Sequence, residues 1–126
     1  MRAVDTNVLV RLITREDTRQ AASADAFIAK GAWVSLLALT EAISVLAAVY
    51  ERKAAGLVTA IEMLLNHEHL VLQDSDAVEA ALALFRSRPS LGFSDCLMLQ
   101  VARKAGHLPL GTFDRGLGKI DGAQKV

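Results

Sequence analysis

Four acidic residues spread along the chain could together carry out metal-dependent hydrolysis: Asp5, Glu41, Asp95 and Asp114. Each alone has an ordinary interpretation: Asp5 and Asp95 can serve the starts of helices, Asp114 can sit in a turn, and Glu41 can be a solvated helix residue. Crowded at one site, such carboxylates repel one another by roughly 4 kcal/mol per pair at about 4 Å and an effective dielectric constant of about 20. A cluster of this kind is tolerable only with bound cations.

The chemistry that such a cluster supports is phosphodiester hydrolysis. Hard divalent cations such as Mg²⁺ and Mn²⁺ take oxygen ligands, keep several water molecules and bridge to substrate phosphates. A water molecule bound to such a cation is activated as a nucleophile and attacks phosphorus in line. The cation also neutralises the negative charge that develops on the phosphate. The four acids therefore predict a nuclease.

The elements that must position these acids alternate between short apolar runs and helical stretches. Predicted strands cover residues 3–4, 32–35, 69–72 and 108–112. Predicted helices cover 8–13, a segment capped by Asp17 or Thr18 and closing at Gly31, 36–55 ended by Gly56, 58–66, a segment capped by Asp74 or Ser75 and reaching Arg86, and a segment capped by Ser94 and ending at Gly106.

Strands separated by helices predict a parallel sheet covered by helices on both faces, the α/β class. In such sheets ligands bind beyond the carboxyl ends of the strands. Asp5 follows the first predicted strand and Asp114 lies just past the fourth. Two of the acids are therefore expected at the same edge of the sheet.

Four stretches resemble the PIN domain, and more narrowly the VapC-type toxins of bacterial and archaeal toxin–antitoxin pairs. They are Val4-Asp5-Thr6-Asn7, Glu41 within its helix, Ser94-Asp95-Cys96-Leu97 and Gly111-Thr112-Phe113-Asp114. They occur in the family's order over nearly the whole chain. The resemblance implies a single three-layer α/β/α domain over residues 1–126 with strand order 3-2-1-4-5. It also implies an Mg²⁺- or Mn²⁺-dependent RNA endonuclease, a homodimer and a small cognate antitoxin.

Carried over by position, the resemblance makes Asp5, Glu41, Asp95 and Asp114 both the catalytic residues and the metal ligands, with Asn7 and Thr112 as polar supporters. The family usually continues through a fifth strand after the T-F-D turn, for which residues 122–126 remain here. Basic residues flank the acidic segments and are either a phosphate-contacting rim or solvated surface charge. These are Arg11, Arg86, Arg88 and Arg115.

Composition narrows the class of protein. Lys+Arg and Asp+Glu both number 14, and this zero net charge disfavours binding of long nucleic acid by bulk electrostatics, although it permits a local basic rim. The longest uncharged stretch, residues 31–40, is far shorter than the roughly 20 residues of a membrane span, so a cytoplasmic protein is expected. The single cysteine, Cys96, is expected to pack in the core.

Three alternatives share the same fold class. A haloacid dehalogenase-like phosphatase needs a second acid two residues after the first, where this chain has Asn7. A receiver-like signalling domain needs a late lysine in an apolar strand, and no convincing candidate is present. A non-catalytic RNA- or metal-binding module on the PIN-like fold would be indicated by loss of one acid, and all four acids are present.

Overall fold

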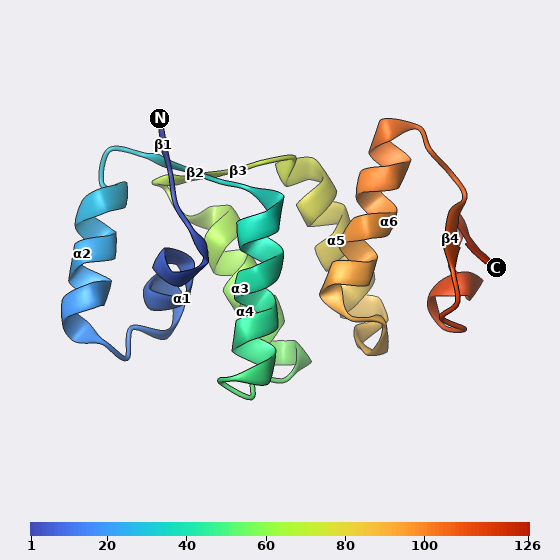
Figure 1. Cartoon of the computed structure of the whole chain (residues 1–126), viewed down its shortest axis with the longest axis horizontal. Coiled ribbons are helices and arrows are strands. Elements are labelled where there is room, and N and C mark those ends of the chain that lie inside the picture. The colour runs from blue at the N-terminus through green and yellow to red at the C-terminus, as the bar shows by residue number, and fades with distance from the viewer. The chain divides into compact units, whose positions relative to one another are not determined.

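The computed structural model describes residues 1–126, which form two compact units, Met1–Ser75 and Asp76–Val126. The first unit contains β1 (Arg2–Ala3), α1 (Thr6–Thr14), α2 (Thr18–Ile28), β2 (Ala32–Val34), α3 (Leu36–Ala48), α4 (Ala54–Asn66) and β3 (Leu70–Leu72). The second contains α5 (Ser75–Ser87, its first residue closing the first unit), α6 (Phe93–Ala105), β4 (Leu110–Thr112) and β5 (Ala123–Lys125), with the short 3-10 helices η1 (Pro89–Leu91) and η2 (Leu117–Lys119). Figure 1 follows these elements along the chain.

The first unit is built on a parallel sheet of order β1-β2-β3. Trp33 is in register with Ala3 on one side and Val71 on the other. Alternate residues of β2 and β3 face opposite sides, so Val34 and Leu72 are buried while Trp33 and Val71 are exposed. Helices α1 to α4 lie together on one side of these strands (Figure 1). The sheet therefore presents one apolar face to its helices.

Side-chain caps start three helices of this unit where the sequence predicts them. Asp5, Asp17 and Ser35 each accept a hydrogen bond from a backbone N–H three residues further on. Such caps satisfy amide groups that have no partner inside the helix. The first cap matters for function, because it fixes Asp5 at the junction between β1 and α1.

The second unit packs around aromatic and aliphatic side chains of α5 and α6. Phe85 and Phe93 meet edge to face, with ring centroids 6.1 Å apart. Strands β4 and β5 pair in parallel, and the Arg103 side chain donates a hydrogen bond to the carbonyl oxygen of Asp121 just before β5 (2.7 Å). These contacts hold the chain on either side of Asp114.

The predicted α/β class with parallel strands is confirmed. The strands pair as 3-2-1 and 4-5, which are the two ends of the expected order. The neighbour relation between β1 and β4, and the description of residues 1–126 as a single domain, stay predictions. The fifth strand is present over three residues, Ala123–Lys125. No helix combines the length and apolar character that crossing a membrane demands.

The predicted helix over residues 36–55 is wrong in its second half. Helix α3 ends at Ala48, and α4 begins at Ala54. Glu51 between them has a left-handed backbone (φ 53°), and the N–H of Arg52 returns to the carbonyl oxygen of Leu46 (3.0 Å). The apolar periodicity runs on through this break and conceals it. Gly56 lies in the first turn of α4, where the helix tolerates it.

Ser94 does not cap its helix. Helix α6 begins one residue earlier, at Phe93, and its N-cap position is Gly92, which has φ 81° and no side chain to accept a hydrogen bond. Glycine adopts this left-handed backbone without steric cost. The consequence is that Asp95 lies in the first turn of α6, near the unsatisfied amide groups of the helix start.

Candidate active site

Asp5 is placed by its own capping role. The residue is extended (φ −94°, ψ −179°), and its Oδ1 accepts a hydrogen bond from the N–H of Val8 (3.1 Å). Its side chain is exposed, so the other carboxylate oxygen remains available to a ligand. The ordinary helix-capping interpretation of Asp5 is therefore correct, and it is compatible with metal binding.

Glu41 lies on α3, and its side chain contacts Thr6, the residue that follows Asp5 in the sequence. Its Oε2 accepts a hydrogen bond from the Thr6 hydroxyl (2.8 Å), which joins α3 to the first turn of α1. Asp5, Thr6 and Glu41 line one open pocket of about 270 Å³, together with residues at the start of α3. The first unit thus brings two of the four predicted acids into one pocket.

Asp95 and Asp114 form a second pair, within the second unit. Asp95 is half-buried, and burial raises the pKa of its carboxyl, with the nearby Asp114 carboxylate raising it further. Both causes act against the ionised form of Asp95. The two side chains are therefore close enough to interact, as a site that attracts a cation requires.

Asp114 is held by the turn that follows β4. Its Oδ1 accepts a hydrogen bond from the N–H of Leu117 (2.8 Å) and its own N–H donates to the Thr112 hydroxyl (3.0 Å). Leu117 is buried, which anchors this turn to the core of the second unit. Thr112, named from the sequence as a polar supporter, thus contacts the backbone of Asp114.

None of these four acids makes a salt bridge. Elsewhere in the chain exposed acids do so: Asp25 pairs with Arg15, and Asp76 pairs with Lys104 (2.8 Å). Within each pair, carboxylate oxygens without a cationic side chain are donors that suit Mg²⁺ or Mn²⁺, which prefer oxygen ligands. The residues present therefore fit a hard divalent cation.

The acids are found as two pairs. No group of three or more His, Cys, Asp or Glu side chains that could hold a metal ion is found in either unit. Asp5 and Glu41 belong to the first unit, and Asp95 and Asp114 to the second. The gathering of all four acids at one metal site stays a prediction.

Other residues named from the sequence are placed as follows. Asn7 is exposed on α1 and lines a cleft with Asp5 and Arg11. Arg88 and Arg115 are exposed in the second unit, as is Arg86 at the end of α5. A role for these arginines in RNA binding stays a prediction.

The single cysteine is a core residue. Cys96 is fully buried, and burial together with the adjacent Asp95 raises the pKa of its thiol to about 11. A thiol of this kind stays protonated and does not act as a nucleophile at neutral pH. The predicted packing role of Cys96 is confirmed.

Thr6 is a residue that the sequence analysis did not assign to the site. Its hydrogen bond to Glu41 spans 35 positions of the chain, a separation that no local pattern reveals. A second omission is one face of α2, whose members Gln20, Ser23 and Phe27 line the cleft that begins at Asp5. Their spacing of three and four residues is a helical signal that could have identified this face.

Comparison with known protein families finds one that matches most of the chain. The model of the PIN domain matches residues 2–123. The chain therefore belongs to the PIN domain family, whose members are generally nucleases. Among curated proteins, none matches the sequence significantly.

Proposed function

We propose that this protein is an Mg²⁺- or Mn²⁺-dependent endoribonuclease that hydrolyses RNA phosphodiester bonds, and that it is the toxin of a toxin–antitoxin pair. Membership of a family of nucleases supports the hydrolytic part of the proposal. The four acids Asp5, Glu41, Asp95 and Asp114 are proposed as the metal ligands and catalytic residues.

The observation that carries the proposal is the absence of a cationic partner for these acids. Burial and the Asp114 carboxylate both disfavour the ionised form of Asp95, and no arginine or lysine forms an ion pair with either acid. An ionised carboxylate that is half-buried near a second carboxylate is costly unless a cation neutralises its charge. A divalent cation held by these acids would neutralise this charge.

Each side chain has a defined task in this proposal. A divalent cation, when bound, activates water and neutralises charge on the phosphate. Asp5 would hold the cation with the oxygen that does not cap α1, and Thr6 orients Glu41 through its hydroxyl. Asp114 is fixed by the N–H of Leu117, which leaves its second oxygen available. Asn7 and Thr112 support the acids with polar atoms.

The test is cleavage of a mixed RNA pool by purified protein with Mg²⁺ or Mn²⁺, with and without EDTA. The matched variants are Asp95→Asn and Asp76→Asn, which make the same chemical change in the same unit. We expect metal-dependent fragments from the wild type and from Asp76→Asn, whose carboxylate serves only an ion pair with Lys104. Cleavage that survives EDTA, or that Asp95→Asn retains, would refute the proposed chemistry.

The toxin assignment rests on the resemblance of the four motifs to VapC-type proteins and has a separate test. Expression of the wild-type chain in the cytoplasm of a bacterial host is expected to arrest growth, while Asp95→Asn is expected to be harmless. A homodimer and a small cognate antitoxin belong to the same assignment. Normal growth with demonstrably active enzyme in the cells would contradict the toxin role and leave the nuclease standing.

A further inference from the structure

A polar side chain follows each strand of the β1-β2-β3 sheet at its carboxyl edge. Asp5 closely follows β1, Ser35 follows β2 and Gln73 follows β3. The proposed function uses Asp5, and Ser35 caps α3. Ligands of parallel α/β sheets bind beyond this edge, so a polar side chain there is placed to serve a site. Gln73 is the one of the three that the proposed reaction leaves without a task.

Gln73 is attached to the neighbouring strand by both its backbone and its side chain. Its N–H donates a hydrogen bond to the carbonyl oxygen of Val34, the last residue of β2 (2.8 Å). Its half-buried side chain accepts a hydrogen bond at Oε1 from the N–H of Leu36 (2.9 Å), 37 positions earlier in the chain. Gln73 therefore binds the segment where β2 passes into α3.

The start of α3 is held by two different acceptors. The first amide groups of a helix have no partner inside the helix and need one elsewhere. Ser35 Oγ accepts a hydrogen bond from the N–H of Ala38 (3.0 Å), and Gln73 provides the acceptor for Leu36. The cap from Ser35 is local and can move with the helix. The bond from Gln73 fixes the helix start to β3.

The same helix carries Glu41. This acid lies five residues beyond Leu36, which is about 7.5 Å along the helix axis. Leu39, between them, is fully buried, so the intervening turn is packed in the core. Glu41 and the start of α3 line one pocket together with Asp5. A shift of the helix start would therefore move Glu41 relative to Asp5.

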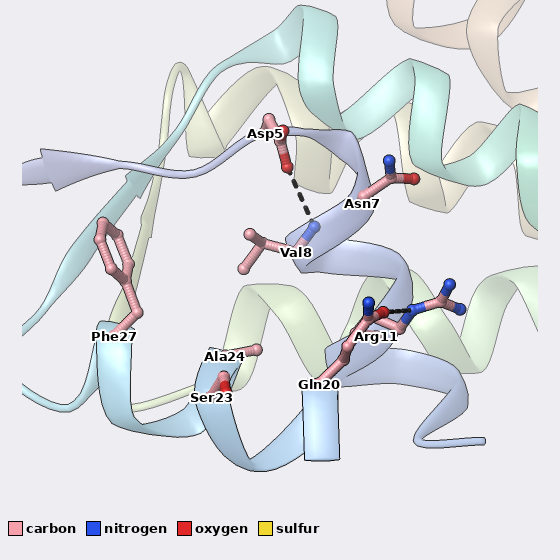
Figure 2. Close-up of a pocket in the computed structure, with 8 residues that line it drawn as sticks. All are labelled: Asp5, Asn7, Val8, Arg11, Gln20, Ser23, Ala24 and Phe27. Atoms are coloured by element: carbon pink, nitrogen blue, oxygen red, sulfur yellow. Dashed lines mark hydrogen bonds between the residues drawn. The ribbon is translucent and has the colours of Figure 1, made fainter. Parts of the chain in front are cut away.

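The two acids of this pocket are held in different ways. Figure 2 shows the Asp5 carboxylate directed at the N–H of Val8 at the start of α1, a bond between residues three positions apart. Glu41 lies in the middle of its helix and has no such local bond. Its carboxylate is held by the Thr6 hydroxyl, and its helix start is held by Gln73. The position of Glu41 thus depends on contacts from other elements.

We propose that Gln73 is a positioning residue for the candidate metal site, because its hydrogen bond to the first amide of α3 sets where Glu41 lies relative to Asp5. The inference rests on the proposed nuclease function and adds a residue from β3 to its machinery. Removal of groups that orient metal ligands typically weakens metal binding about 10–100-fold. Gln73 acts through the helix, so the lower end of this range is expected.

The test is a Mn²⁺ titration of the full chain, followed by the electron paramagnetic resonance signal of the free ion, with urea unfolding of the same samples. Gln73→Met keeps an unbranched side chain but replaces the carboxamide by a weakly accepting thioether. Gln73→Asn keeps a carboxamide that is one methylene shorter. Both variants are expected to bind Mn²⁺ about tenfold more weakly. Gln73→Glu keeps an oxygen acceptor at full length and is expected to bind Mn²⁺ at least as tightly as the wild type.

A matched control separates positioning from a general loss of stability. Asp17 accepts a hydrogen bond from the N–H of Gln20 at the start of α2, a helix that carries none of the four acids (2.9 Å). Asp17→Ala is therefore expected to lower stability to urea and to bind Mn²⁺ like the wild type.

A double-mutant cycle tests whether Gln73 acts through Glu41. Residues that act as a unit give non-additive effects, so Gln73→Met is expected to cause no further loss of Mn²⁺ affinity in a Glu41→Gln background. An equal loss in both backgrounds would overturn the inference, because Gln73 would then act on another part of the site.

Two further outcomes would overturn the inference: wild-type Mn²⁺ affinity in a folded Gln73→Met or Gln73→Asn variant, or binding by Gln73→Glu that is as weak as that of Gln73→Met. In either case RNA cleavage by the wild type would leave the proposed function standing. A wild type that neither binds Mn²⁺ nor cleaves RNA would contradict the proposed function, and this inference with it. The two failures are therefore distinguishable.

Discussion

In the first unit both acids accept hydrogen bonds that fix them, whereas in the second unit only Asp114 does, from the N–H of Leu117, and Asp95 accepts none. Asp5 caps α1, and Glu41 is held by the Thr6 hydroxyl. Asp95 is half-buried, and both burial and the Asp114 carboxylate disfavour its ionised form. The fold thus holds both acids of the first pair by hydrogen bonds, whereas in the second pair the ionised form of Asp95 is disfavoured by its surroundings.

This difference separates two roles that an acid at a metal site can have. A carboxylate that also caps a helix contributes to stability, so its removal changes both the fold and the chemistry. A carboxylate that is repelled by its neighbour contributes little to the metal-free fold. Substitution of Asp95 is therefore expected to change activity with little effect on stability, whereas substitution of Asp5 is expected to change both.

The largest effect is expected for Asp95→Asn, which removes charge and little volume. We expect RNA cleavage to fall at least about a hundredfold, because metal-ion stabilisation is worth several kcal/mol and each 1.4 kcal/mol is tenfold in rate. In EDTA the variant is expected to be as stable as the wild type or more so, because repulsion by Asp114 is relieved. Loss of the helical circular dichroism signal in this variant would show that Asp95 is structural.

At Asp5, two substitutions distinguish the contribution of the helix cap to stability from the contribution of the carboxylate to RNA cleavage. Asp5→Ala removes the cap and is expected to lower the free energy of unfolding by about 1 kcal/mol, while Asp5→Asn retains a good capping side chain. Both variants are expected to lose cleavage. Urea unfolding and RNA cleavage measured on the same samples check this. Equal stability of the two variants would show that the hydrogen bond to Val8 contributes nothing.

A smaller effect is expected at Thr6, which acts on the reaction through Glu41. Thr6→Val keeps the branched shape but removes the hydroxyl donor, and cleavage is expected to fall about tenfold, as for other residues that orient metal ligands. Thr6→Ser keeps the donor and is expected to restore the rate. If Thr6→Ser is as slow as Thr6→Val, shape rather than the hydrogen bond sets the position of Glu41.

The smallest effect is expected at Asp25, an exposed acid outside the site. A hydrogen bond from Arg15 lowers the pKa of Asp25, so its contribution to stability is present above the unfolded-state pKa of about 3.9 and is lost as the pH falls through the lower folded value. The wild type is therefore expected to lose slightly more stability than Asp25→Asn between pH 5 and about pH 2. Parallel pH profiles in urea unfolding would rule out this contribution.

Local signals predict much of the fold. The caps at Asp5, Asp17 and Ser35 follow from side chains that accept hydrogen bonds from nearby amides, and the end of α6 follows from Gly106 in a left-handed conformation. The break at Glu51 is not predictable in this way. It depends on a left-handed backbone at a glutamate, a conformation uncommon for residues other than glycine, within an uninterrupted apolar pattern.

The sequence identifies the acidic residues of the candidate site, but it does not predict their contacts. Residue type and the positions of strand ends and helix starts single out the four acids. The contact between Thr6 and Glu41 joins residues that are 35 positions apart, and the cleft depends on how α1 and α2 face each other. The interaction of Asp95 with Asp114 likewise depends on the path of the chain between α6 and β4. Packing over such separations decides these features.

The most direct test of the proposed metal site is a Mn²⁺ titration followed by the electron paramagnetic resonance signal of the free ion. The samples are the wild type, Asp5→Asn from the first unit and Asp95→Asn from the second, with Asp25→Asn and Asp76→Asn as matched controls. We predict that each site variant binds Mn²⁺ at least about tenfold more weakly, while both controls bind like the wild type. Wild-type Mn²⁺ affinity in either folded site variant would contradict the assignment of that acid as a metal ligand.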